Sequence, residues 1–181
     1  SENPPHDIFL KPNWSNNFML LYSFSKVFRL TGHRVGAVVT STKRMQEIEK
    51  FLDTSTICPN QIGQHAALFG LKKLSYWVQE QRLDLLKRRE SLERGFEDLE
   101  SDGWVLRGLG AYFAYLEYPF TISSRELSKR LLEEKGVLTV PGALFSNKTE
   151  AAANRFLRVA FANISLDDIQ ILFQRLKSFK L

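Results

Sequence analysis

The sequence has a single cysteine, Cys58, among its 181 residues. One cysteine cannot form an intrachain disulfide, so a disulfide-stabilised scaffold is excluded and a reducing compartment, the cytoplasm, is expected. Because no histidine neighbours Cys58 in the chain, we expect a small buried side chain there and not a nucleophile. The three histidines, His6, His33 and His65, show no ligand spacing with cysteine or acidic residues, so no metal site is predicted.

Long apolar runs and blocks of like charge are also missing. No hydrophobic stretch approaches the roughly 20 residues that span a bilayer, so no membrane partner is expected. The 25 basic and 20 acidic residues give a formal charge of +5 but are interspersed, so no nucleic-acid partner is predicted. The hydrophobic fraction of 44%, with 14 Phe, favours a packed globular core.

Turn residues and hydrophobic spacing indicate how the chain is organised. Two short apolar stretches, 18–24 and 35–39, predict buried strands. A helix is predicted from Thr42, ending before Pro59. The segment 60–100 has no proline and few glycines, which predicts one very long helix or two joined ones. Its expected buried face includes Ile62 and Phe69 and shifts near Gly70.

The rest of the chain predicts a small α/β unit. Strands are expected at 104–106, 111–118, 137–140 and 156–161. Ser123 begins a helix as the first residue of a capping box, and Gly136 is expected to end it. Ser165 caps a last helix. The residues expected to be buried by these two helices are Leu127, Leu131 and Leu132, and Ile169, Leu172, Phe173 and Leu176.

The segment SFSKVFRLTGHRVG, from Ser23 to Gly36, carries the most chemical information. A phosphorylated aldehyde needs such a set, because an amine condenses with the carbonyl while hydroxyls and an arginine bind the phosphate. Lys26 is the candidate amine, placed after a buried strand where desolvation would favour its neutral form. The candidate phosphate ligands are Ser23, Ser25 and Arg34, and Gly32 is expected to allow the turn before Arg34.

This segment resembles the lysine signature of fold-type I pyridoxal-phosphate (PLP) aminotransferases of class I/II. The segment 154–161 resembles the family's C-terminal strand, where Arg158 matches the arginine that binds the substrate α-carboxylate. The resemblance implies PLP as the cofactor, with Lys26 as its covalent anchor and proton carrier. It also implies transfer of an amino group between an amino acid and a 2-oxo acid, in a cytoplasmic homodimer.

The resemblance predicts an α/β fold that corresponds to the C-terminal portion of a fold-type I enzyme. It places the end of the large PLP-binding domain in 1–58, a long interdomain helix in 59–100 and a small C-terminal domain in 101–181. Family members are about twice this length, so an upstream half is expected to be missing. A two-stranded remnant cannot cover both its faces, so the chain is expected to be a fragment or to pair with another chain.

One residue departs from the family pattern, and three alternatives stay open. Arg29 stands where the family has a small residue, and a long cation is tolerable there if it points to solvent. The chain could be a non-catalytic, truncated segment, or could serve another PLP chemistry, such as that of a lyase, decarboxylase or synthase. Residues 23–26 also match the S-x-x-K motif of serine penicillin-binding hydrolases, but the companion S-D-N and K-T-G motifs are absent.

Overall fold

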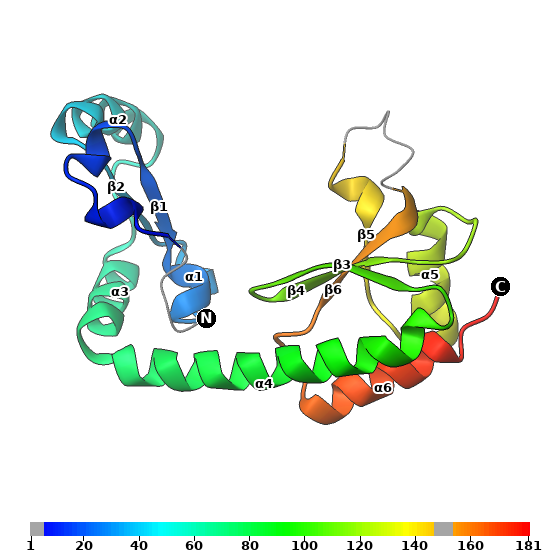
Figure 1. Cartoon of the computed structure of the whole chain (residues 1–181). Coiled ribbons are helices and arrows are strands. Elements are labelled where there is room, and N and C mark those ends of the chain that lie inside the picture. The colour runs from blue at the N-terminus through cyan, green and yellow to red at the C-terminus, as the bar shows by residue number, and fades with distance from the viewer. Residues whose placement is uncertain (1–5, 147–153) are drawn as a thin grey trace. The chain divides into compact units, whose positions relative to one another are not determined.

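The computed structural model describes residues 6–146 and 154–181. The chain divides into two compact units, Ser1–Glu80 and Gln81–Leu181. The first unit runs from blue to blue-green in Figure 1 and the second from green to red. The fold is mixed α/β, as the sequence predicts.

A two-stranded antiparallel sheet, β1 (Leu20–Ser23) with β2 (Gly36–Val39), organises the first unit. The segment between the two strands contains the one-turn helix α1 (Phe24–Val27) and the 3-10 helix η3 (Thr31–His33). The other elements of this unit are η1 (Ile8–Leu10), η2 (Trp14–Asn16), α2 (Thr42–Ser55), α3 (Gln61–Lys73) and the start of α4 (Ser75–Glu100).

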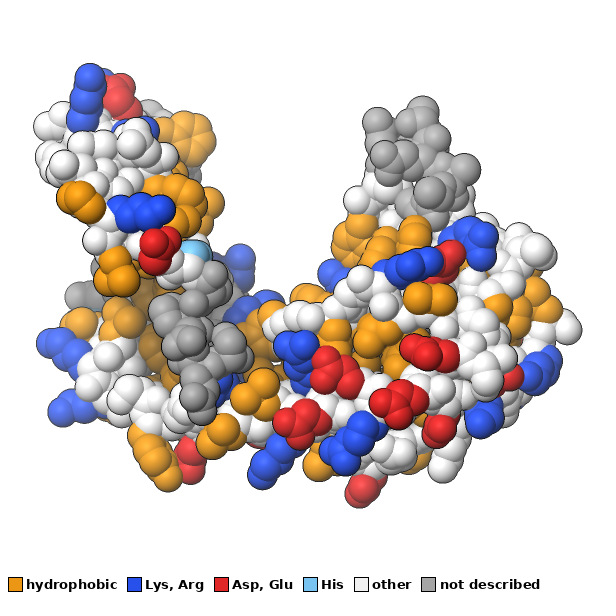
Figure 2. Space-filling view, in the orientation of Figure 1, with side chains coloured by type: hydrophobic (Ala, Val, Ile, Leu, Met, Phe, Trp, Pro, Cys, Tyr) orange, Lys and Arg blue, Asp and Glu red, His pale blue; other side chains and the backbone are white. Residues whose placement is uncertain are grey.

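The expected burial of the first two strands is wrong. Leu21 in β1 is 72% exposed, and none of the residues of β1 or β2 is fully buried. The reason is that β1 and β2 pair only with each other among the described residues, so nothing covers both sheet faces. A cavity of about 410 Å³ also lies between the sheet and α2, and α2 buries no residue. Hydrophobic side chains are accordingly visible at the surface of this unit (Figure 2).

The small core of the first unit is built on glycine and alanine in α3. The expected buried residues Ile62 and Phe69 are 73% and 58% exposed, and α3 instead buries Gly63, Ala67 and Gly70. This face is favoured because a ring can approach a glycine closely: a Cβ built on Gly70 would lie 2.6 Å from the ring of Phe28. The fully buried apolar side chains of this cluster are Phe24, Val35 and Ala67.

The segment 60–100 forms two joined helices, which is the second of the two predicted arrangements. The break falls at Leu74, which has φ −106° and ψ 17° and donates its N–H to the Gly70 carbonyl at 3.0 Å. Helix α4 begins at Ser75 and continues into the second unit, because the division falls after Glu80.

The second unit contains a four-stranded antiparallel sheet in the order β3-β4-β6-β5. Its strands are β3 (Val105–Gly110), β4 (Phe113–Glu117), β5 (Val140–Pro141) and β6 (Phe156–Ala160). The strand expected at 137–140 is therefore reduced to two residues and includes Pro141. The helices are α5 (Ser124–Lys135), η4 (Gly142–Leu144) and α6 (Leu166–Lys177).

The helix ends of this unit follow the sequence signals. Ser123 accepts a hydrogen bond from the Glu126 N–H at 3.2 Å, and Gly136 ends α5 with φ 62°. Ser165 and Asp168 form a complete capping box at the start of α6. The expected burial of Leu132 is wrong, since it is 49% exposed. It lies about 100° around the helix from the buried Leu131, on the solvent side.

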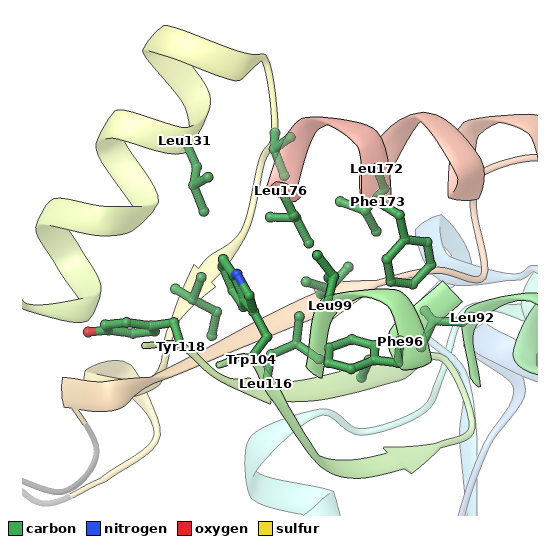
Figure 3. Packing of buried hydrophobic residues seen from close by; sticks show 14 of the residues in the cluster. Leu92, Phe96, Leu99, Trp104, Leu116, Tyr118, Leu131, Leu172, Phe173 and Leu176 are labelled. Atoms are coloured by element: carbon green, nitrogen blue, oxygen red, sulfur yellow. The ribbon is translucent and has the colours of Figure 1, made fainter. Parts of the chain in front are cut away.

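The main core lies on one face of this sheet, where α4, α5 and α6 pack (Figure 3). Alternation along β4 and β6 turns Ala114, Leu116, Leu157 and Val159 toward the helices, and each is less than 5% exposed. The predicted stripe of α6, from Ile169 to Leu176, is buried against them. The opposite face of the sheet is free of these helices and carries Phe113, Tyr115, Phe156 and Arg158.

Candidate active site

The lysine segment lies between the two strands of the first unit. Ser23 is the last residue of β1, Ser25 is half-buried in α1, and Lys26 lies exposed in the same turn. Burial of Lys26, which the sequence predicts from a buried preceding strand, is therefore wrong. The cause is the uncovered sheet described above.

The strand pairing closes this segment into one loop. Ser23 is the register partner of Gly36, so the chain leaves and re-enters the sheet at the same point. Gly36 is required there, because a Cβ would lie 2.9 Å from the Tyr22 carbonyl oxygen. Arg34 comes two residues before Gly36, so Lys26 and Arg34 belong to a loop whose ends meet.

Backbone strain in the loop falls on two arginines and not on the expected glycine. Arg29 and Arg34 have φ of 56° and 50°, whereas Gly32 has no positive φ. Arg34 lies exposed at the end of η3, where its Nη1 donates to the Thr31 carbonyl at 2.9 Å. Arg29 is exposed, and its Cζ lies 5.5 Å from the centroid of the Trp77 ring. That ring contact has no signature in the local sequence.

Two stacked rings hold the helix that carries Lys26. Phe24 is 7% exposed, and its ring centroid lies 6.0 Å from that of Phe28 with the planes 10° apart. These residues are four apart, so they share one side of the turn. Phe28 in turn contacts Gly70 of α3. The turn is therefore anchored by its apolar side while Lys26 remains accessible.

Arg158 lies on the open sheet face of the second unit, at the centre of β6. It is half-buried, between the buried Leu157 and Val159. Its Cζ lies 4.3 Å from the centroid of the Phe113 ring and 4.7 Å from that of Phe145. Its Nε is buried and has no hydrogen-bond partner among the residues that the structure describes. The sequence identifies Arg158 but not its two ring partners.

The neighbours of Arg158 on this face are an aromatic pair and a paired carboxylate. Tyr115 is its direct partner across β4 and β6 and stacks on Phe156 at 5.1 Å. Burial raises the pKa of the Tyr115 hydroxyl, so it stays protonated. Glu117 forms ion pairs with Arg107 at 2.6 Å and with Arg155 at 3.5 Å. Arg155 is exposed.

Two remaining expectations concern Cys58 and membranes. Cys58 is exposed and not buried, because the segment after α2 lies at the rim of the open cavity. Within residues 6–146 and 154–181, no helix has the length and apolar character that crossing a membrane requires.

A comparison with known families adds to this geometry. Residues 8–176 match the model of the family described as aminotransferase class I and II. The chain belongs to this family. The matched range includes the segment from Ser23 to Gly36, the helices α3 and α4, and the strand that carries Arg158. The family resemblance that the motifs indicate is therefore confirmed.

Curated class I and II aminotransferases resemble the chain at moderate identity. An aspartate aminotransferase from Sulfurisphaera tokodaii is 28% identical over 179 residues, covering 93% of this chain and 42% of the relative. A (5-formylfuran-3-yl)methyl phosphate transaminase from Methanocaldococcus jannaschii is 28% identical over 162 residues, covering 89% of this chain and 41% of the relative.

Solved structures of the family share the fold. A Methanococcus jannaschii protein, whose active site is described as similar to those of kynurenine aminotransferases, has a TM-score of 0.75 and 26% identity, covering 89% of this chain and 42% of that one. A Thermus thermophilus aspartate aminotransferase variant has a TM-score of 0.73 and 26% identity, over 87% and 42%. The chain thus spans about two fifths of these relatives and corresponds to a C-terminal portion of the class I and II fold.

Proposed function

We propose that this chain provides the cofactor lysine and the carboxylate-binding arginine of a PLP-dependent aminotransferase. The reaction transfers an amino group between an amino acid and a 2-oxo acid. The observation that carries the proposal is the lysine loop, in which the register pair Ser23 and Gly36 closes the segment that holds Lys26 and Arg34. Family membership supports the same chemistry.

The residues of the loop fit the chemical groups of PLP. The Lys26 amine is exposed and can condense with an aldehyde. The hydroxyls of Ser23 and Ser25 and the free edge of Arg34 offer neutral and charge-assisted donors to a phosphate. When bound, PLP supplies an electron sink for the bonds of the substrate α-carbon.

Lys26 would have a second role, as a proton carrier at the substrate α-carbon. Its neutral amine can take the proton from the α-carbon and later deliver it, acting first as a general base and then as a general acid.

Arg158 is proposed to bind the α-carboxylate of the amino acid. A guanidinium presents parallel N–H donors that match a carboxylate in a bidentate pair. The buried, unpartnered Nε of Arg158 supports this role, because an unsatisfied donor is costly and a ligand oxygen would satisfy it. No residue pairs with it in the ion pairs of the described residues.

The remainder of the family fold is required for full activity. The chain covers 42% of a curated relative. The family resemblance implies that the remaining part supplies an aspartate that pairs with the pyridine nitrogen of the cofactor. We therefore expect weak or no turnover from the chain alone, and we propose a cytoplasmic homodimer for the complete enzyme. The same coverage makes a non-catalytic segment the second candidate.

Titration of the chain with PLP tests the proposal. We expect a visible absorbance band that Lys26→Ala abolishes and that Lys43→Ala, an exposed lysine of α2, retains. In an enzyme completed with the rest of the family fold, Arg158→Ala should lower kcat/KM for every amino acid tried. The expected loss of transition-state stabilisation is about 2–4 kcal/mol. A band that persists in Lys26→Ala would refute the assignment of the lysine, and turnover never detected in the completed enzyme would favour the non-catalytic candidate.

A further inference from the structure

Among the described residues, Arg158 has no carboxylate partner in an ion pair. Its Nε atom is buried, and buried charged groups are normally paired. The acidic side chain on the same sheet face, Glu117, is instead engaged by Arg107 at 2.6 Å and Arg155 at 3.5 Å. Arg158 takes part in none of the ion pairs formed by the described residues, and its Nε has no partner.

Two phenylalanine rings stand where a counter-ion would be expected. The guanidinium carbon lies 4.3 Å from the centroid of Phe113 and 4.7 Å from that of Phe145, within the roughly 6 Å range of a cation–π contact. A ring attracts the cation through its face and does not accept a hydrogen bond from the guanidinium N–H groups. A carboxylate partner would occupy two of them. The rings therefore stabilise the cation while leaving its donors for a ligand.

The two rings reach Arg158 from separate, fixed elements. Phe113 begins β4 and is the register partner of Ala160 in β6, which places it on the same face as Arg158. Phe145 ends η4, where its N–H donates to the Gly142 carbonyl at 2.9 Å. The 3-10 helix η4 is held against α5, because the Ala143 N–H donates to the hydroxyl of buried Ser124 at 3.3 Å.

We propose that Phe113 and Phe145 are positioning residues that hold Arg158, free of any internal carboxylate, for the carboxylate of an amino acid or oxo acid. This proposal rests on the proposed function in assigning Arg158 to that ligand. Since both rings contact the guanidinium through their faces, a ligand meets its N–H edge, whose parallel donors match a planar carboxylate in a bidentate pair.

Acetate titration of the 181-residue chain, followed by NMR at the Arg158 Nε–Hε signal, tests the proposal. The signal is assigned by its loss in Arg158→Lys. Acetate should shift it saturably at constant ionic strength. Phe113→Leu and Phe145→Leu should each weaken acetate binding about threefold to tenfold, whereas Phe113→Tyr, which keeps a ring, should stay within about twofold.

Phe156→Leu is the matched control, because Phe156 lies on the same face but stacks on Tyr115 and not on Arg158. Equal weakening in this control, unchanged acetate binding in both leucine variants, or no saturable shift in the wild type would each overturn the proposal. If a leucine variant fails to fold, Phe113→Tyr decides: wild-type binding supports the role of the ring, and loss of binding refutes it.

Failure of this proposal and failure of the proposed function are distinguishable. The titration contains no PLP and does not involve Lys26, which belongs to the first unit. A chain that does not capture PLP can still show ring-dependent acetate binding at Arg158. A chain that captures PLP at Lys26 but binds acetate without help from the rings would contradict this inference alone.

Discussion

Replacing Gly70 by alanine should disturb the lysine loop without touching any site residue. A Cβ built on Gly70 would lie 2.6, 2.7 and 2.8 Å from three ring carbons of Phe28, where normal contacts are about 3.5–4.0 Å. The ring must therefore withdraw by about 1 Å. Phe28 stacks on Phe24, so this shift is passed to the turn that carries Lys26.

The magnitude follows from two opposing effects. Overpacking of this kind costs about 1–3 kcal/mol, and the better helix propensity of alanine returns about 1 kcal/mol. We expect a net destabilisation of up to about 2 kcal/mol, with 1 kcal/mol as the central figure. Local opening of α1 and α3 should accordingly become about fivefold more frequent.

Native-state hydrogen exchange of the amides in α1 and α3 measures this effect, and PLP capture measured in parallel should weaken. Leu71→Ala is the control, because Leu71 is 59% exposed on the same helix. Adding Phe28→Leu to Gly70→Ala should remove most of the penalty, since the clashing ring carbons are gone. Slower exchange in Gly70→Ala with unchanged PLP capture would refute the reasoning.

Two further predictions concern the second unit. Gly95→Ala should lower the melting temperature of this unit by several degrees, because a Cβ there would lie 2.2 Å from the ring of Phe173. Replacement of the exposed Glu97 by alanine is the control and should leave the melting temperature nearly unchanged. A higher melting temperature in Gly95→Ala would contradict this packing. Burial raises the pKa of Tyr118 from 10.0 to about 12, so its contribution to stability is complete below pH 10 and is lost as the pH rises toward 12. Denaturant unfolding at about pH 9 and about pH 11 should show this loss in the wild type and a smaller one in Tyr118→Phe; equal losses would contradict it.

The second unit could be predicted largely from local signals. The Ser165 cap and the helical spacing from Ile169 to Leu176 both act within one helix, and both are confirmed. The first unit could not be predicted in this way. Burial of Leu21 depends on a covering layer that β1 and β2 lack, and α3 buries Gly70 and not Phe69 because close ring packing favours a glycine.

The residues of the candidate site that belong to one local motif could be predicted from the sequence. The contacts between residues that are far apart in the chain could not. Lys26 and Arg34 are identified by their spacing, and the pairing of Ser23 with Gly36 places them on one closed loop. The rings of Phe113 and Phe145 come from separate elements, so no local pattern links either to Arg158. The exposure of Lys26 was missed because it depends on sheet coverage.

Borohydride reduction of the PLP-treated chain, followed by peptide mapping, tests the central claim most directly. We predict that the reduced cofactor is found on the peptide that contains Lys26, and that Arg34→Ala weakens this capture by removing a phosphate ligand. Stable labelling concentrated on a different lysine, with Lys26 unmodified, would contradict the account.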